Sequence, residues 1–338
     1  MTALSWLSIY LIGWVQGAGM IRLLGSRDVS DEEISTIGFS PSGKLMAVGC
    51  TEGDLSIYSL PSLKRVCQHK FAVSDVEQAS FLSENEVVLG FLPRASKGEP
   101  PLVNFAWRTK TLKWSFGDAS ILKFGGMFIE GRNAIILGVG DLPALGLDIV
   151  TVASGDVVRH NQIVERLSDQ EETHIWKLGV SSGSFAIGGG AFSPEMGPGH
   201  VSFYSNLGSR LLSRFEYEDS IEGLAPLPRG LAFVTTGTGD GLVLNPLTGR
   251  IERKVSLEDR DPFGLPLKLF CGTLGSDYLW CAGYSLRILR RTDMYPMAIR
   301  AFQFKTFLAA GSPTGLYICR VDEEDKGRFS LYMVTPNR

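Results

Sequence analysis

Two glycine-rich segments of the chain contain the residue types that bind phosphate in nucleotide-binding proteins. Residues 38–44 (GFSPSGK) have the spacing of a P-loop, in which the lysine contacts the phosphates of a nucleotide. However, Leu45 stands where a serine or threonine would hold magnesium, and a strand-like run follows where a P-loop needs a helix. The segment TTGTGDG at 235–241 also has no helical pattern after it. We therefore interpret both segments as turns between strands and expect no cofactor.

Histidine and cysteine are well suited to hold a metal or attack a substrate, but neither type is clustered in the sequence. A zinc site needs several such ligands, usually with some of them close together in the chain. The cysteines are odd in number, form no CxxC pair and lie in a long chain, so a disulfide framework is not expected either. We predict no metal site, no catalytic residue and reduced thiols for these residues: His69, His160, His174, His200, Cys50, Cys67, Cys271, Cys281 and Cys319.

The charge of the chain is nearly balanced. It has 33 Lys and Arg residues against 36 Asp and Glu residues, which gives a net charge of −3. The densest basic set is Arg287, Arg290 and Arg291 (LRILRR), and it lacks the interleaved aromatic residues that stack on bases. We interpret the acidic runs 169–172 and 322–325 as exposed loop tips, with a patch for a basic partner as the alternative. No nucleic-acid partner is expected.

The elements that would position functional residues are indicated by an internal repeat. A short apolar run that ends in small residues and glycine recurs along the chain, and its glycine follows the previous one after 41 to 50 residues. This spacing is close to the roughly 40–45 residues of a four-stranded propeller blade. The repeated glycines are Gly49, Gly90, Gly138, Gly188, Gly237 and Gly283.

Each repeat has the pattern of four short strands. In the first repeat, alternating or continuous apolar runs separated by turn residues predict strands at 34–40, 44–50, 55–60 and 64–71. After the sixth repeat only three strands remain, and residues 19–26 (GMIRLLGS) supply a fourth from the start of the chain. We therefore predict an all-β fold over residues 19–338, a seven-bladed β-propeller of four-stranded antiparallel blades whose ring is closed by an N-terminal strand.

The first repeat resembles a WD-repeat. The segment IGFSPSGKLMAVGCTEGDLSIYSL has the family's order of strand, S-P-x-G-x turn, small-residue strand, turn and third strand. Tyr58 and Ser59 stand where the family has its terminal Trp-Asp, and the opening Gly-His dipeptide is also absent. The resemblance implies a WD-repeat-like propeller, whereas the family's buried Asp–His hydrogen-bond network is not carried over.

A second similarity concerns the run IYSLPSLKRV, which looks like the corresponding strand–turn–strand of the endoplasmic-reticulum exchange factor for the small GTPase Sar. That resemblance implies a guanine nucleotide exchange factor with a divergent propeller. The family's glycine-rich potassium-binding loop and its C-terminal membrane span have no counterpart in this sequence. Exchange activity is therefore kept as an alternative function.

The N-terminal segment is apolar and carries no charged side chain from Met1 to Ile21. Residues 1–18 allow three interpretations: a buried strand or helix, a membrane anchor, or a signal peptide without a basic start. If the segment is an anchor, Arg22 and Arg27 lie just beyond it and place the propeller in the cytoplasm. We expect a cytoplasmic protein, with membrane association through residues 1–21 as the alternative.

Long loops give the prediction of a binding site. The connections after the second strand are long at 92–101, 140–146 and 191–199, and in a propeller these connections share one face. Long loops on a rigid scaffold tend to carry function. We predict that this face binds a protein partner through Arg94, Lys97, Leu145, Phe192, Glu195 and Met196.

These patterns together predict a protein-interaction scaffold, a subunit of a larger complex, rather than an enzyme. No small-molecule substrate is expected. Two alternatives remain: the Sar-type exchange factor, and a divergent propeller hydrolase that would gather carboxylates from several blades in a central channel. Fold alone does not decide among these functions.

Overall fold

The computed structural model of the chain describes residues 20–29, 31–72, 75–91, 102–116, 124–130, 134–139, 145–151, 153–163, 171–177, 184–191, 199–205, 210–257 and 269–335. These residues form β-strands, turns and the short 3-10 turns η1 (Thr51–Gly53) and η4 (Pro228–Gly230), with no α-helix in this part of the chain. The prediction of an all-β fold is therefore confirmed.

Three sheets, each built from four consecutive strands, come from the first half of the chain. Their strands are β2 (Ile34–Phe39), β3 (Leu45–Cys50), β4 (Asp54–Ser59) and β5 (Lys64–Lys70); β6 (Val76–Phe81), β7 (Glu86–Phe91), β8 (Leu102–Ala106) and β9 (Thr111–Phe116); and β10 (Phe124–Glu130), β11 (Ala134–Val139), β12 (Leu145–Thr151) and β13 (Val157–Ile163).

Three further sheets repeat the same order in the second half. Their strands are β14 (Glu171–Lys177), β15 (Phe185–Ala191), β16 (Gly199–Ser205) and β17 (Arg210–Tyr217); β18 (Ile221–Pro226), β19 (Ala232–Thr236), β20 (Asp240–Asn245) and β21 (Arg250–Ser256); and β22 (Phe270–Leu274), β23 (Tyr278–Ala282), β24 (Ser285–Arg290) and β25 (Pro296–Ala301).

The remaining four-stranded sheet takes strands from both ends of the described chain. Its order is β1-β28-β27-β26, where the strands are β1 (Ile21–Asp28), β26 (Thr306–Gly311), β27 (Tyr317–Asp322) and β28 (Asp325–Val334). β1 runs antiparallel to β28 with Ile21 opposite Val334, and the Thr335 N–H donates to the Met20 carbonyl at 2.9 Å. The strand predicted at 19–26 is thus present two residues further along.

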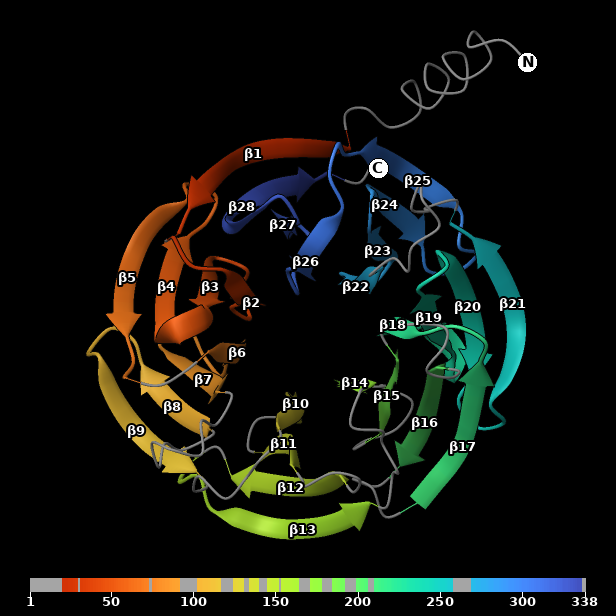
Figure 1. Cartoon of the computed structure of the whole chain (residues 1–338), viewed down its shortest axis with the longest axis horizontal. Coiled ribbons are helices and arrows are strands. Elements are labelled where there is room, and N and C mark those ends of the chain that lie inside the picture. The colour runs from red at the N-terminus through yellow and green to blue at the C-terminus, as the bar shows by residue number, and fades with distance from the viewer. Residues whose placement is uncertain are drawn as a thin grey trace, which may run out of the picture.

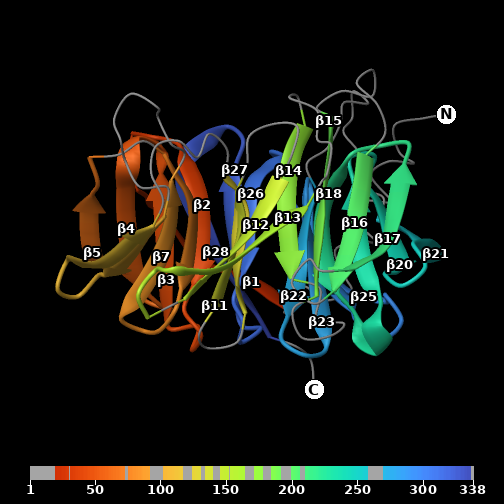
Figure 2. The same ribbon diagram turned by 90° about the horizontal axis from the view of Figure 1, so that it is seen from below.

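The sheets are arranged like blades around a common centre (Figure 1). The first strand of each consecutive set lies nearest the centre and the fourth lies at the rim, while the side view in Figure 2 shows the strands running between two opposite faces. The middle strands are buried along their length, as in β3 and β19, whereas the rim strands β5 and β21 are mostly exposed. This gradient explains the continuous apolar runs in the sequence, because a middle strand is covered on both sides by neighbouring sheets.

Each rim strand also carries one extra residue relative to its neighbour. The register shift occurs in the pairing of the third and fourth strand of all seven sheets, and it leaves one residue of the rim strand without a partner. Such a β-bulge bends the strand and increases its twist. The unpaired residues are Leu24, Val66, Lys113, Val158, Leu212, Glu252 and Met297.

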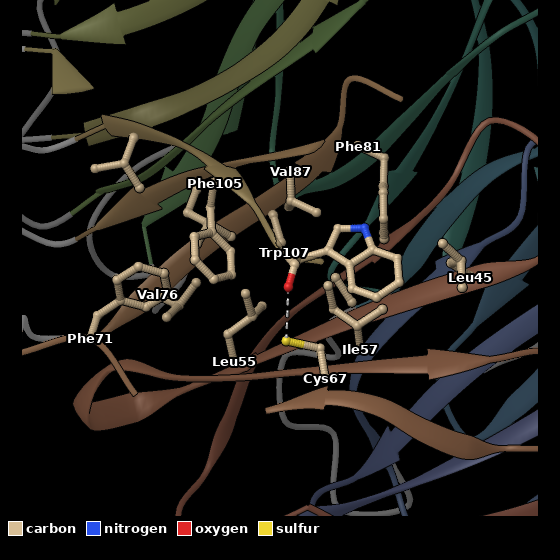
Figure 3. Packing of buried hydrophobic residues seen from close by; sticks show 14 of the residues in the cluster. Leu45, Leu55, Ile57, Cys67, Phe71, Val76, Phe81, Val87, Phe105 and Trp107 are labelled. Carbon is tan, nitrogen blue, oxygen red and sulfur yellow. Dashed lines mark hydrogen bonds between the residues drawn. The ribbon is translucent and has the colours of Figure 1, made fainter. Parts of the chain in front are cut away.

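The hydrophobic core lies between adjacent sheets. In the cluster between the sheets β2–β5 and β6–β9, Phe71 packs against Phe91 and Phe105 with ring centroids 5.3 and 5.1 Å apart (Figure 3). The Cys67 Sγ–H donates to the Trp107 carbonyl, with 3.6 Å between sulfur and oxygen, and so connects the two sheets. Each such layer removes the apolar faces of both sheets from water, which is the main favourable term in folding.

Close packing explains two of the repeated glycines. A Cβ atom on Gly49 would lie 2.7 Å from methyl carbons of Thr36 and Val76, and Val76 belongs to the next sheet. A Cβ on Gly188 would lie 2.4 Å from the His200 carbonyl oxygen. Gly237 and Gly283 instead follow directly after β19 and β23, so the six glycines are not equivalent.

The interpretations of residues 1–18 as a buried segment, an anchor or a signal peptide lie outside the described residues. Met20 and Ile21, which follow that segment, are both buried against the last sheet and its neighbour. Within the described part of the chain, no helix has the length and apolar character needed to cross a membrane.

Candidate functional site

The predicted partner-binding residues are not brought together by the described part of the structure. Arg94, Lys97, Phe192, Glu195 and Met196 lie outside the described residues. Leu145 was placed in a loop that ended at residue 146, and this was wrong, because Leu145 is the first residue of β12 and lies opposite Ile163 of β13. β12 has the sequence LGLDIVT and takes in the last two residues of the predicted loop, so the backbone of Leu145 is paired.

Both glycine-rich segments are turns between strands, as predicted. Residues 40–44 connect β2 to β3, with Gly43 at φ 68° and its N–H donating to the Ser40 carbonyl at 2.9 Å. Residues 237–239 connect β19 to β20, with Gly239 at φ 83°. A φ in this region favours glycine, so the turn conformation accounts for these two glycines.

The cysteines of the described chain form no disulfides. Cys271 is half-buried and the others are buried. Burial raises the pKa of the Cys67 and Cys319 thiols, so both stay protonated near neutral pH and are poor nucleophiles. In the residues that the structure describes, no group of three His, Cys, Asp or Glu side chains is placed to hold a metal ion.

A different feature offers a site for binding, namely a cavity of about 220 Å³ between the sheets β18–β21 and β22–β25. We call it the arginine cavity. It lies at the face formed by the connections between the first and second and between the third and fourth strands, which include 227–231 and 291–295. It is lined by Leu227, Pro228, Arg229, Leu231, Val243, Glu252, Arg253, Arg291, Thr292 and Met294.

Two tight turns shape the rim of the arginine cavity. In η4 the Leu227 N–H donates to the Leu231 carbonyl at 2.8 Å, which closes the connection around Arg229 at φ 62°. In the connection after β24, the Met294 N–H donates to the Arg290 carbonyl at 2.8 Å, and Met294 has a φ of 57°. Few non-glycine residues adopt such a φ, so the two turns hold Arg229 and Met294 in defined positions.

The floor of the arginine cavity is apolar. Leu227, Val243 and Met294 are buried, and all three belong to the core cluster between the sheets β18–β21 and β22–β25. Their side chains are therefore fixed by packing on the sides that do not face the cavity. A ligand that enters here meets a preformed hydrophobic surface.

Arg291 links the two sheets that enclose the cavity. Its two Nη groups donate to the carbonyls of Ser276 and Pro226, each at 2.7 Å, while its Nε is buried without an acceptor among the described residues. Burial lowers the pKa of the Arg291 guanidinium, and the nearby Asp277 carboxylate acts in the opposite direction. An arginine remains charged despite such a shift, so a positive charge is held at the cavity wall.

Further charged residues stand at the exposed edge. The Arg253 Nη1 donates to the Asp293 carbonyl oxygen at 2.7 Å, and Arg229 is exposed. Among the described residues that line the cavity, Glu252 supplies a carboxylate, and its Oε1 accepts a hydrogen bond from the Asn245 Nδ2 at 3.3 Å. The three guanidinium groups of the lining are suited to binding an anionic group.

The sequence pointed to only one member of this cavity. Arg291 was part of the basic run LRILRR, but the structure separates that run: Arg287 donates to Ser285 Oγ at 2.9 Å and Arg290 pairs with Asp293 at 3.2 Å. Arg229 reaches the same place from η4 and Arg253 from β21, and no local pattern marks them. Only the contact between the two sheets brings the three arginines to one cavity.

Comparisons with known proteins do not assign the chain to a family: no protein-family model matches its sequence, and no curated protein matches it.

Proposed function

We propose that the chain is a divergent WD-repeat-like propeller of seven blades, closed by its N-terminal strand, and that it works as a protein-interaction scaffold within a larger assembly. The arrangement of four-stranded sheets around a centre and the pairing of β1 with β28 support this architecture. A rigid scaffold that presents turns at two faces suits the binding of protein partners.

The observation that carries the proposal is the arginine cavity. It joins an apolar floor to three guanidinium groups, and arginine and methionine are among the residue types enriched where proteins bind proteins. No contact of the described residues favours the exchange-factor or the hydrolase alternative, and both stay predictions from the sequence.

The proposal is tested by affinity purification of the full-length chain and of variants at each face. Arg229→Glu/Arg253→Glu reverses two exposed charges at the cavity, and Arg65→Glu/Arg210→Glu makes the same change at exposed positions on other sheets. We expect a stoichiometric partner that is retained by the wild type and by the control variant but is lost from the cavity variant.

A third variant separates the two faces. Replacing Arg94, Phe192 and Met196 together tests the long loops after the second strands, which the sequence predicts to bind a partner. Loss of the partner from this variant alone would move the binding site to the long loops, and the absence of any stoichiometric partner from all four proteins would contradict the scaffold function itself.

A further inference from the structure

We infer that the arginine cavity binds an acidic peptide segment of a protein partner, with an aliphatic side chain on the cavity floor and a neighbouring carboxylate on the guanidinium groups. This inference deepens the proposed function and rests on it. It names the chemistry of the partner, which the proposal of a scaffold leaves open.

The size of the cavity favours a side chain over a cofactor. Sites for drug-sized ligands and cofactors enclose about 300–1,000 Å³, whereas this cavity has a volume of about 220 Å³. Its floor of Leu227, Val243 and Met294 is apolar and held in place by the core. Insertion of one aliphatic side chain would remove apolar surface from water on both partners, which favours binding.

The positive charge of the cavity favours acidic residues next to that aliphatic side chain in the bound peptide. The described lining contains one carboxylate, that of Glu252, and three arginines, namely Arg229, Arg253 and Arg291. Of the carboxylates just outside the lining, Asp293 is held by Arg290 Nη1 at 3.2 Å and by the Tyr295 N–H at 3.1 Å. The Asp277 carboxylate lies near Arg291. The three guanidinium groups still outnumber Glu252 and Asp277, and guanidinium forms its strongest hydrogen bonds with carboxylates.

Arg291 is already oriented for such a contact. Its two Nη groups are fixed on the carbonyls of Ser276 and Pro226, so little side-chain freedom is left to lose on binding. The Arg291 guanidinium thus adds a fixed positive charge at the cavity wall, which favours a bound carboxylate.

The same observations disfavour other anionic partners. Single-stranded nucleic acid is bound through aromatic side chains that stack on its bases, and none of the residues lining the cavity is aromatic. A phosphate group alone would use the arginines but leave the apolar floor without a ligand. A peptide with an aliphatic residue next to Asp or Glu uses both parts of the site.

The test is selection from a random peptide display library on the immobilised full-length chain, followed by binding measurements with synthetic peptides. We expect enriched sequences to place Leu, Ile, Val or Met next to Asp or Glu. For the best peptide, changing the acidic residue to its amide, or the aliphatic residue to alanine, should weaken binding by about tenfold or more. Arg229→Glu/Arg253→Glu should weaken it similarly, and Arg65→Glu/Arg210→Glu should not.

Three results would overturn the inference: no enrichment, enrichment of basic or uncharged sequences, or acidic peptides that bind the cavity variant as tightly as the wild type. Circular dichroism melting curves of the variants confirm that the fold is intact. If the affinity purification still yields a stoichiometric partner while the library fails, the scaffold function stands and only the peptide chemistry is wrong. If neither yields a ligand, both are wrong.

Discussion

Among the described residues, Arg320 is the largest charged side chain that is buried, with 2% of its surface exposed. Its guanidinium pairs with Asp322, donates from Nε to the Thr306 Oγ1 at 2.7 Å, and lies 3.7 Å from the centroid of the Phe302 ring. Thr306 in turn donates to the Gly283 carbonyl of the neighbouring sheet. Thr306 thus connects the last sheet to the preceding one, and Arg320 holds Thr306, Asp322 and the Phe302 ring together beside that connection.

Replacing Arg320 with alanine should lower the free energy of unfolding by about 3 kcal/mol, because the change leaves the half-buried Asp322 without its cation and opens a cavity. Arg328→Ala serves as the control, since Arg328 and its partner Asp28 are exposed and 3.7 Å apart. That change should cost no more than about 0.5 kcal/mol. Urea unfolding followed by tryptophan fluorescence measures both, and equal losses would show that the network has no special role.

His69 gives the fold a dependence on pH. Its ring lies against Phe71 and Phe105, with centroids 4.5 and 4.7 Å away, and burial, followed by the charge of Lys110, lowers its pKa below the ordinary value of 6.5. Below pH 6.5 the unfolded chain therefore binds a proton that the folded chain does not bind. This contribution to stability is present above pH 6.5 and is lost as the pH falls toward the folded-state pKa.

We expect the unfolding midpoint of the wild type to fall between pH 7.5 and pH 5.5, and the fall to be smaller in His69→Gln. Urea titrations at several pH values measure the difference between the two proteins, which removes the contribution of the other histidines. Parallel curves for the two proteins would mean that His69 titrates alike in the folded and unfolded chains.

At the scale of the element, β1 shows how one strand is held by two kinds of contact. Its backbone pairs with β28, and Ile21 is buried beside Trp280 and Tyr332 in the cluster that joins the last sheet to its neighbour. Leu23, two residues later, is 42% exposed. The start of the strand is therefore held by packing as well as by hydrogen bonds, and Leu24 packs against the next core cluster while Leu23 stays exposed.

Ile21→Asp should destabilise the protein by about 3 kcal/mol, because it places a carboxylate in an apolar core cluster. Leu23→Asp introduces the same group on the same strand at an exposed position, and we expect a change within about 0.5 kcal/mol. Thermal unfolding by circular dichroism compares the two. Similar melting temperatures would contradict the docking of Ile21 in the core.

The elements were more predictable from the sequence than the site. Strands such as LSIYSL and KLMAVGC are marked by local alternation, apolar runs and turn residues, and the order of strands follows because neighbours in the chain pair with each other. The arginine cavity depends on Arg229, Arg253 and Arg291, which are far apart in the sequence and lie in segments that look like ordinary turns and rim strands. Their meeting is a property of how two sheets pack, and a single sequence carries no local signal for it.

At the scale of the whole molecule, the two ends of the described chain meet in one sheet. The hydrogen bond between Thr335 and Met20 and the pairing of Ile21 with Val334 place the start of β1 beside the end of β28. If the seven sheets form a closed ring, the fold does not require the chain to begin and end in any particular sheet. The two ends could then be moved to another sheet without loss of the contacts between sheets.

Closure of the ring predicts that a circular permutant of the chain folds. A short glycine–serine linker joins Thr335 to Met20, and the new ends are opened at the exposed turn between Leu247 and Thr248, which connects β20 to β21. We expect a monomer with the circular dichroism spectrum of the wild type and a single cooperative melting transition. A permutant that remains unfolded or aggregates, while a second one opened at the Pro61–Ser62 turn does the same, would contradict closure of the ring.

The irregular rim strands have a consequence for how copies of the molecule meet. The outermost strand of every sheet offers its backbone N–H and C=O groups on one open side, and an even row of such groups is a template on which another chain can add a strand. The extra residue in each of these strands breaks the row, and charged side chains such as those of RIERKVS line it. Growth of fibres by edge-to-edge addition is thereby opposed at each of these strands.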